Sequence, residues 1–261
     1  MRINELFNKY KNRKPVLIGY LPAGYPTIHK FTRYVKEAVK AGLDCIEIGI
    51  PSKNSNLDGR VISRAMASVI KRGISPEKAI SIAGNAISHS GIPGISMFYY
   101  STVKEMGITH TLSLLKNHGV EGILVPNIPI DKWYSYASAA VSMDLKPIGF
   151  IGAKMNDNDI QLIVSKAQGF LYLQAYEGIT GEKITLSHDI MSRMEKVKRM
   201  CGERSLPIAV GFGIKSKEDA LLLRDIGADG IIIGTALIEA LEGGITEVSD
   251  FISVMSEAIT D

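Results

Sequence analysis

The chain has 261 residues, of which 46% are hydrophobic and 22% are charged, and its formal net charge at pH 7 is +3. This apolar content is enough for a sizeable core without disulfide or metal cross-links, and the nearly balanced charge gives no reason to expect a nucleic-acid partner. No run of about 18 apolar residues predicts a membrane span, and residues 1–15 contain no apolar stretch typical of a signal peptide, so we expect a soluble cytoplasmic protein.

Short apolar segments recur along the whole chain, and each of them is predicted to be a strand. Because they are almost continuously apolar rather than alternating, they are typical of parallel strands that are covered on both faces. Segments with helical spacing lie between them, such as the stripes made by Phe31, Tyr34, Val35, Ala38 and Val39 and by Ile160, Ile163 and Val164. The predicted strands are residues 16–20, 45–50, 94–98, 122–125, 146–151, 169–173, 207–210 and 230–233.

Helix start signals agree with this alternation of strands and helices. Ser75 followed by Pro76 predicts an N-cap with proline at the first helical position, and Ser216 with Asp219 forms an acidic variant of the capping box. We therefore predict the α/β class, with residues 1–261 forming a single (β/α)8 TIM barrel. A doubly wound sheet is the alternative, but residues 211–216 do not complete its G-x-G-x-x-G fingerprint.

Two carboxylates mark a candidate catalytic site. In a barrel the functional residues lie at the carboxyl ends of the strands. Glu47 interrupts an otherwise apolar strand, and alternation turns it to the same side as Cys45 and Gly49, which could be the barrel interior. A buried carboxylate is costly, so it is either a core salt bridge or a functional group. Asp58 follows in the next loop and is either a turn residue or a second carboxylate of the same site.

Glycine-rich loops near the C-terminus suggest a phosphate site. One loop, residues 211–214, follows the seventh predicted strand, and another, residues 234–236, follows the eighth and opens a helix. Loops at these two places commonly bind phosphate in barrels, although either could be a simple tight turn. The loop at residues 178–181 has glycines that suit closure over a substrate. Tyr172 is placed near the site or in the core.

Other chemistries have weaker support. The five histidines show no spacing typical of metal ligands, so we expect no metal site. Cys45 and Cys201 have no C-x-x-C partner and suit a reducing compartment. Lys154 follows the fifth strand and is either a solvated loop lysine or the Schiff-base lysine of an aldolase.

Taken in order along the chain, these motifs resemble the tryptophan synthase alpha subunit family. The most specific is I-E-I-G-I-P at residues 46–51, followed by L-D-G at residues 57–59. The other similar segments are residues 22–26, 97–100, 124–129, 178–181, 210–214 and 234–236.

This resemblance implies a lyase that splits indole-3-glycerol phosphate into indole and glyceraldehyde 3-phosphate by a retro-aldol reaction. It makes Glu47 the acid/base group and Asp58 the partner of the indole nitrogen. It also implies no cofactor in this chain, and a beta subunit that carries pyridoxal phosphate in an alpha2beta2 assembly. The residues that it assigns to the indole pocket, the closing loop and the phosphate site are Tyr20, Tyr99, Tyr172, Thr180, Gly181, Gly211, Phe212, Gly213, Gly234 and Thr235.

The chain also departs from the family pattern in several loops. The usual Phe-Ser-Asp-Pro is replaced by Ser52, Lys53, Asn54 and Ser55, while Ser101 and Asn127 replace an asparagine and an aspartate, and residues 175–177 differ as well. These changes affect the loops expected to couple the chain to a beta subunit. Two rival functions are another phosphate-binding barrel enzyme and a barrel without catalysis that only activates a partner.

Overall fold

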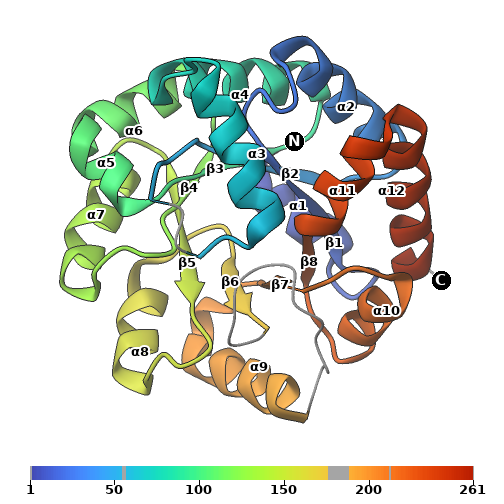
Figure 1. Cartoon of the computed structure of the whole chain (residues 1–261). Helices are drawn as coiled ribbons and strands as arrows, with labels where there is room; N and C mark the ends of the chain where they lie inside the picture. The colour runs from blue at the N-terminus through green and yellow to red at the C-terminus, as the bar shows by residue number, and fades with distance from the viewer. Residues whose placement is uncertain (1, 55–56, 176–187, 212, 261) are drawn as a thin grey trace.

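The computed structural model describes residues 2–54, 57–175, 188–211 and 213–260. Eight parallel strands close into a barrel in chain order, and the helices form a ring around it (Figure 1). The (β/α)8 barrel predicted from the sequence is therefore confirmed. The strands are β1 (Val16–Pro22), β2 (Cys45–Gly49), β3 (Gly94–Met97), β4 (Gly122–Leu124), β5 (Lys146–Ile151), β6 (Leu171–Gln174), β7 (Ile208–Gly211) and β8 (Gly230–Ile233).

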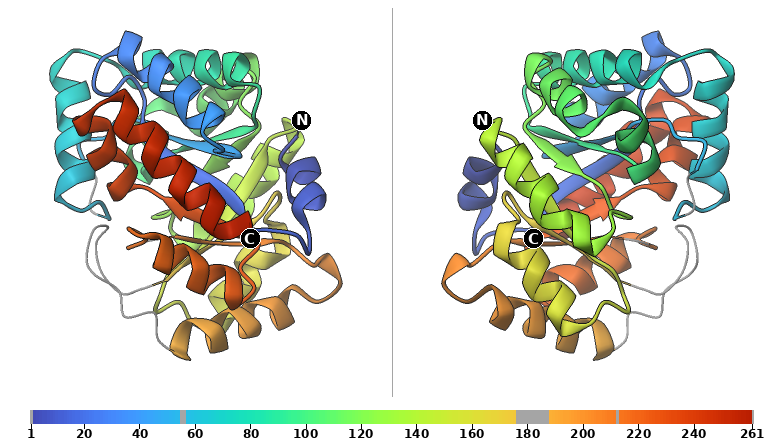
Figure 2. Two further views of the ribbon diagram at one scale, coloured as in Figure 1. Left: turned by 90° about the vertical axis from the view of Figure 1, so that its right-hand side faces the viewer. Right: turned by 90° about the vertical axis from the view of Figure 1, so that its left-hand side faces the viewer.

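The helices lie between the strands, with one before the barrel and extra helices in several connections (Figure 2). Within the described residues, none of them is both long and apolar enough to cross a membrane. They are α1 (Ile3–Tyr10), α2 (Ile28–Lys40), α3 (Arg60–Lys71), α4 (Pro76–Ser90), α5 (Tyr100–Met106), α6 (Ile108–Asn117), α7 (Ile130–Ser142), α8 (Asp157–Lys166), α9 (His188–Cys201), the 3-10 turn η1 (Gly202–Arg204), α10 (Lys217–Asp225), α11 (Thr235–Gly243) and α12 (Ile245–Thr260).

The helix start signals form the predicted caps. The Ser75 side chain accepts a hydrogen bond from the Lys78 amide at the start of α4. Ser216 and Asp219 form a reciprocal capping box at the start of α10. Both predicted apolar stripes pack inward: Ile160, Ile163 and Val164 are the buried residues of α8, while in α2 all members of the stripe are buried except Val39, which is partly exposed. Each cap satisfies helix amides that would otherwise lack a partner, and so fixes where the loop ends.

Strands β5 and β8 have the predicted bounds, and the other six differ from the prediction by one or two residues at one end or both. Strand β1 continues to Pro22, which pairs with Gly49 of β2, because proline is tolerated at the end of a strand although it cannot donate a ladder hydrogen bond. Strand β6 begins at Leu171 and continues through the polar Gln174, which pairs with Gly211. Backbone pairing with the neighbouring strand sets these ends, and the apolar pattern alone does not show it.

Helix α1 packs against the amino ends of the strands. Ile3 and Leu6 are fully buried, and the Phe7 ring lies 5.3 Å from the ring of Phe170, which immediately precedes β6. The Ile3 amide donates to the Glu121 carboxylate just before β4. This packing closes the base of the barrel and leaves the carboxyl ends of the strands for a binding site.

Candidate functional site

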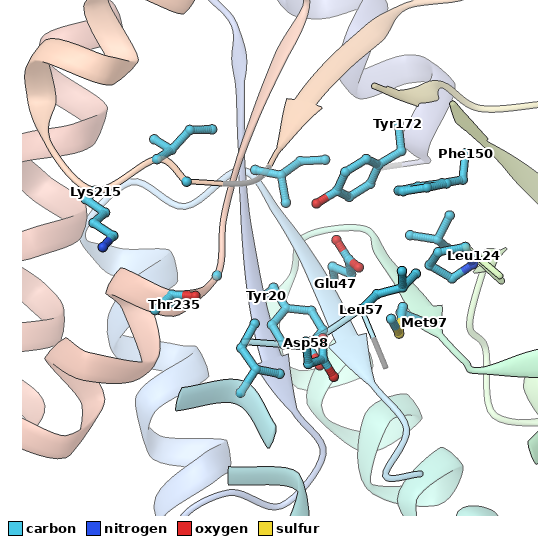
Figure 3. A pocket seen from close by; sticks show the side chains of 16 residues that line it. Tyr20, Glu47, Leu57, Asp58, Met97, Leu124, Phe150, Tyr172, Lys215 and Thr235 are labelled. Carbon is cyan, nitrogen blue, oxygen red and sulfur yellow. The ribbon is translucent and has the colours of Figure 1, made fainter. Parts of the chain in front are cut away.

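A pocket lies at the carboxyl ends of the strands. Figure 3 shows Glu47 near its centre, with Lys215 and Thr235 toward one side and Leu124 and Phe150 toward the other. Its walls come from strands and loops all around the barrel, so only the closed fold assembles it. The lining residues are Tyr20, Glu47, Leu57, Asp58, Ile62, Met97, Leu124, Pro126, Phe150, Tyr172, Gly213, Ile214, Lys215, Ile232, Gly234 and Thr235.

Strand β2 carries Glu47 into this pocket. Glu47 is 3% exposed, and its Oε2 atom has no hydrogen-bond partner among the described residues. It is opposite Tyr20 in the pairing of β1 with β2. The sequence left open a core salt bridge at this position, but no ion pair to Glu47 exists in the described part of the chain. Glu47 is therefore an unpaired acid that faces a cavity.

Asp58 comes from the loop that leads into α3. Gly59 is the N-cap residue of that helix, which places Asp58 immediately before it. The Oδ2 atom of Asp58 is buried without a hydrogen-bond partner. The fully buried Tyr99, which follows β3, lies behind this loop, and its hydroxyl interacts with Asp58. Asp58 thus belongs to the pocket and is more than a turn residue.

Burial changes the protonation of both carboxyl groups. Removal from water raises the pKa of Glu47 to about 8, with a further contribution from the negative charge of Asp58. Burial also raises the pKa of Asp58 to about 7, although the Tyr99 hydroxyl opposes this by stabilising the carboxylate. The two groups interact and titrate as a pair. Near neutral pH the pair therefore holds about one proton, preferentially on Glu47.

Unpaired polar atoms converge on the same pocket. Eight buried side-chain polar atoms lack a hydrogen-bond partner in the described residues, and four of them belong to residues that line this pocket. Buried polar groups in proteins are nearly always satisfied, so a cluster of unsatisfied ones indicates a ligand that supplies the missing partners. The four are Tyr20 Oη, Glu47 Oε2, Asp58 Oδ2 and Thr235 Oγ1.

One half of the pocket is lined by aromatic and aliphatic side chains. The Phe150 and Tyr172 rings lie 5.4 Å apart on the adjacent strands β5 and β6. Met97 and Leu124 end β3 and β4 and add aliphatic surface. A pocket with these walls suits a planar aromatic ring.

The other half presents backbone and polar groups. Gly234 is the N-cap of α11, and Thr235 is the first residue of that helix. Gly213 has a positive φ of 79° in the loop after β7, a conformation that favours glycine. Helix amino termini attract anions, because their first amides lack partners and the helix dipole is positive there. This half of the pocket therefore suits a phosphate group.

Most of the residues predicted from the sequence come together here. The pocket contains Tyr20, Glu47, Asp58, Tyr172, Gly213, Gly234 and Thr235. Thr180, Gly181 and Phe212 lie outside the described residues. Tyr99 stands behind Asp58 rather than in the pocket wall.

Gly211 also does not line the pocket, and the structure explains in another way why position 211 is a glycine. A Cβ atom at Gly211 would lie 2.6 Å from Cζ of Tyr172. The same holds for Gly49, where a Cβ atom would lie 2.7 Å from Cζ of Tyr20. These glycines make room for the two pocket tyrosines.

Several wall residues were not predicted from the sequence. Met97, Leu124, Phe150 and Ile232 lie at or near strand ends, so the rule that placed Glu47 could also have found them. Lys215 gave no such signal, because a single lysine in a loop is usually a solvated residue. It is the only basic residue among the described ones that line the pocket.

The rival chemistries gain no support from the described residues. No group of three or more potential metal ligands occurs among them. Lys154 is exposed and lines a neighbouring cavity with Asn127 and Gln174 rather than the pocket of the two carboxylates. Asn127, one of the departures from the family pattern, accepts a hydrogen bond from the Tyr100 amide at the start of α5.

Comparison with known proteins identifies the family. The model of the tryptophan synthase alpha chain family matches residues 6–258. The alpha chain of Dehalococcoides mccartyi is 30% identical over 260 residues, covering 99% of each chain. That of Methanosarcina barkeri is 31% identical over 244 residues, covering 93% of this chain and 90% of that one.

Solved structures agree with this result. A structure of Mycobacterium tuberculosis tryptophan synthase superimposes with a TM-score of 0.89 at 25% identity, covering 99% of this chain and 98% of that one. The tryptophan synthase alpha chain of Legionella pneumophila gives a TM-score of 0.84 at 26% identity, covering 98% and 96%. The chain therefore belongs to the tryptophan synthase alpha chain family, the indole-3-glycerol-phosphate lyases of tryptophan biosynthesis, which hold no cofactor of their own.

Proposed function

We propose that Glu47 and Asp58 carry out the retro-aldol cleavage of indole-3-glycerol phosphate in this chain. The observation that supports this most directly is the pair of buried carboxyl groups, with pKa values raised to about 8 and about 7, in one pocket. One side of that pocket suits an indole ring and the other suits a phosphate group. The substrate has the same three parts: a ring, a reacting carbon chain and a terminal phosphate.

The raised pKa values give each carboxyl group a role. Glu47, protonated near neutral pH, donates its proton to C3 of the indole ring, and positive charge develops toward the ring nitrogen. Asp58, as carboxylate, accepts the hydrogen bond of the ring N–H and stabilises that charge. Glu47, now a carboxylate, removes the proton of the hydroxyl group on the carbon attached to the ring.

Cleavage of the carbon–carbon bond then completes the reaction. Its electron pair returns to the ring and neutralises the nitrogen, while the hydroxyl carbon becomes the aldehyde of glyceraldehyde 3-phosphate. Glu47 is again protonated, so no proton is consumed overall. One residue can serve as acid and then as base because its pKa lies close to neutral pH.

The remaining predicted residues are proposed to hold the substrate. Tyr20 and Tyr172 would contact the ring and chain, and Tyr99 would orient Asp58. Gly213, Gly234 and Thr235 would bind the phosphate, where the unpaired Oγ1 of Thr235 supports this role. Thr180, Gly181 and Phe212, which lie outside the described residues, are proposed on the sequence alone to belong to the closing loop and phosphate site. Gly211 contributes by leaving room for the Tyr172 ring.

The subunit assembly and the cellular location of the chain are proposed from the related structures and from the cysteines. The Mycobacterium tuberculosis neighbours are structures of tryptophan synthase, which supports a beta subunit as partner, with pyridoxal phosphate in that subunit and an alpha2beta2 assembly. We place the chain, as one barrel domain, in the cytoplasm, since Cys45 and Cys201 are free and buried.

The deciding experiment measures indole release from indole-3-glycerol phosphate, alone and with a saturating beta subunit. We expect release in both cases and a faster rate in the complex. Activation without any turnover by the chain itself would support the non-catalytic alternative. Trapping of substrate on Lys154 by borohydride would support an aldolase instead.

A further inference from the structure

Lys215 has a position in the pocket that the reaction described above does not use. It follows Ile214 in the loop between β7 and α10, and it lines the pocket together with Gly213, Gly234 and Thr235. Figure 3 shows its side chain on the same side of the pocket as Thr235, with Glu47 between them and Phe150. Lys215 is thus at the end that suits a phosphate group.

The charges around the pocket call for a cation at that end. Glu47 and Asp58 are acidic, and Lys215 is the only basic residue among the described ones that form the walls. A substrate with a terminal phosphate dianion would be repelled by an ionised carboxylate in a site of low dielectric. Backbone amides and the Thr235 hydroxyl supply partial charges, whereas a lysine ammonium supplies a full one.

We propose that Lys215 is the ionic anchor of the substrate phosphate and makes the pocket select ligands with a dianionic terminal group. This inference rests on the proposed function of the same site. In that arrangement Lys215 contacts the phosphate and not the reacting carbon, so it acts on capture and affinity rather than on bond cleavage.

The loop geometry allows this role to be tested cleanly. The main-chain amide of Lys215 donates to Asp219 Oδ2 at 2.9 Å, and the amide of Ser216 donates to the same carboxylate at 3.0 Å. These bonds, which cap α10, use no side-chain atom of Lys215. A change of its side chain therefore leaves the cap in place.

The test compares Lys215→Met and Lys215→Arg with Lys217→Met. Lys217 is a matched control in the first turn of α10, because it is exposed like Lys215 but lies outside the pocket wall. Binding of sn-glycerol 3-phosphate is measured by calorimetry, and kcat and KM are measured with indole-3-glycerol phosphate. We expect Lys215→Met to raise Kd and KM about 10-fold, as for a lost charged hydrogen bond, with kcat within about 2-fold. Arginine should restore most of the affinity, and the control should match the wild type.

The salt dependence of binding is a second measurement, and a merely structural role of Lys215 would not alter it. Raising the ionic strength should weaken glycerol phosphate binding by the wild type more than by Lys215→Met, because only the wild type has the ionic contact. Equal affinity of the two proteins, equal salt dependence, or a loss confined to kcat would overturn the anchor.

The experiments can reject the role of Lys215 in phosphate binding and the proposed cleavage reaction independently of each other. Binding of glycerol phosphate that depends on Lys215, without any indole release, would support the anchor and reject the proposed reaction. Indole release with the same KM in both proteins would do the reverse. A wild-type protein that neither binds glycerol phosphate nor releases indole would reject both.

Discussion

Replacement of Glu47 by glutamine should strongly slow catalysis and at the same time stabilise the fold. Glutamine keeps the shape of the side chain but cannot lose a proton. As general acid and base, Glu47 is expected to contribute about 10²–10⁴-fold to the rate. The stability effect follows from its burial, which raises the pKa from 4.5 to about 8.

The size and sign of that effect come from proton linkage. Below about pH 4.5 the glutamate is protonated in the folded and the unfolded protein, so its ionisation does not lower the free energy of unfolding. As the pH rises from 4.5 toward 8, only the unfolded form ionises freely, and the free energy of unfolding of the wild type falls. At about 1.4 kcal/mol for each tenfold change in proton affinity, the loss approaches about 5 kcal/mol above pH 8. Because Asp58 can take up part of the charge adjustment, we expect about 2–4 kcal/mol.

The assay is urea unfolding of the wild type and of Glu47→Gln at pH 4.5, 7 and 9, beside indole release at pH 7.5. The difference in the free energy of unfolding between the two proteins should be small at pH 4.5 and should grow to about 2–4 kcal/mol in favour of the variant at pH 9. A difference that does not change with pH would refute the raised pKa. A folded variant with near-normal turnover would remove Glu47 from the mechanism.

Three further predictions concern the same pocket. Asp58→Asn should lower kcat with little change in KM, since its hydrogen bond strengthens only as charge develops on the ring; a change confined to KM would make Asp58 a binding residue. The pH profile of kcat/KM should rise through about 7 as Asp58 ionises and fall above about 8 as Glu47 loses its proton, and a flat profile between pH 6 and 9 would contradict the two-carboxylate scheme. Gly234→Val should weaken glycerol phosphate binding, because its side chain would cover the amides of α11. Gly234→Ala is the control and should fold normally, because a Cβ atom there meets its nearest neighbour at 3.6 Å. Equal binding by the wild type and the valine variant would place the phosphate elsewhere.

The sequence was most informative where a local pattern decides the structure. Continuous apolar segments predicted all eight strands, and Ser75 and Ser216 predicted their helix starts, because capping depends on neighbours a few residues away. Glu47 could be recognised because a charge in a fully apolar strand needs an explanation.

Features that depend on contacts between strands could not be predicted. The reason for glycine at position 211 lies in Tyr172 on the adjacent strand, and the role of Tyr99 depends on the distant loop at Asp58. The raised pKa values arise from burial in the assembled barrel. Lys215 is an exposed lysine in a loop, and only the assembled pocket shows that it lies beside Gly213, Gly234 and Thr235.

The packing of the two pocket tyrosines against glycines limits how the sequence of this site can diverge in evolution. Tyr20 lies over Gly49 and Tyr172 lies over Gly211, so each aromatic ring occupies space left by a missing side chain on the neighbouring strand. A methyl group at either glycine would displace the ring and reshape the cavity. Substitutions at these two pairs are therefore expected to be strongly epistatic: Gly211→Ala should be harmful with tyrosine at position 172 and better tolerated with a smaller residue there. The width of the substrate pocket is thus determined by each tyrosine together with its facing glycine. A lineage that acquires a new ring specificity would have to change both residues of such a pair.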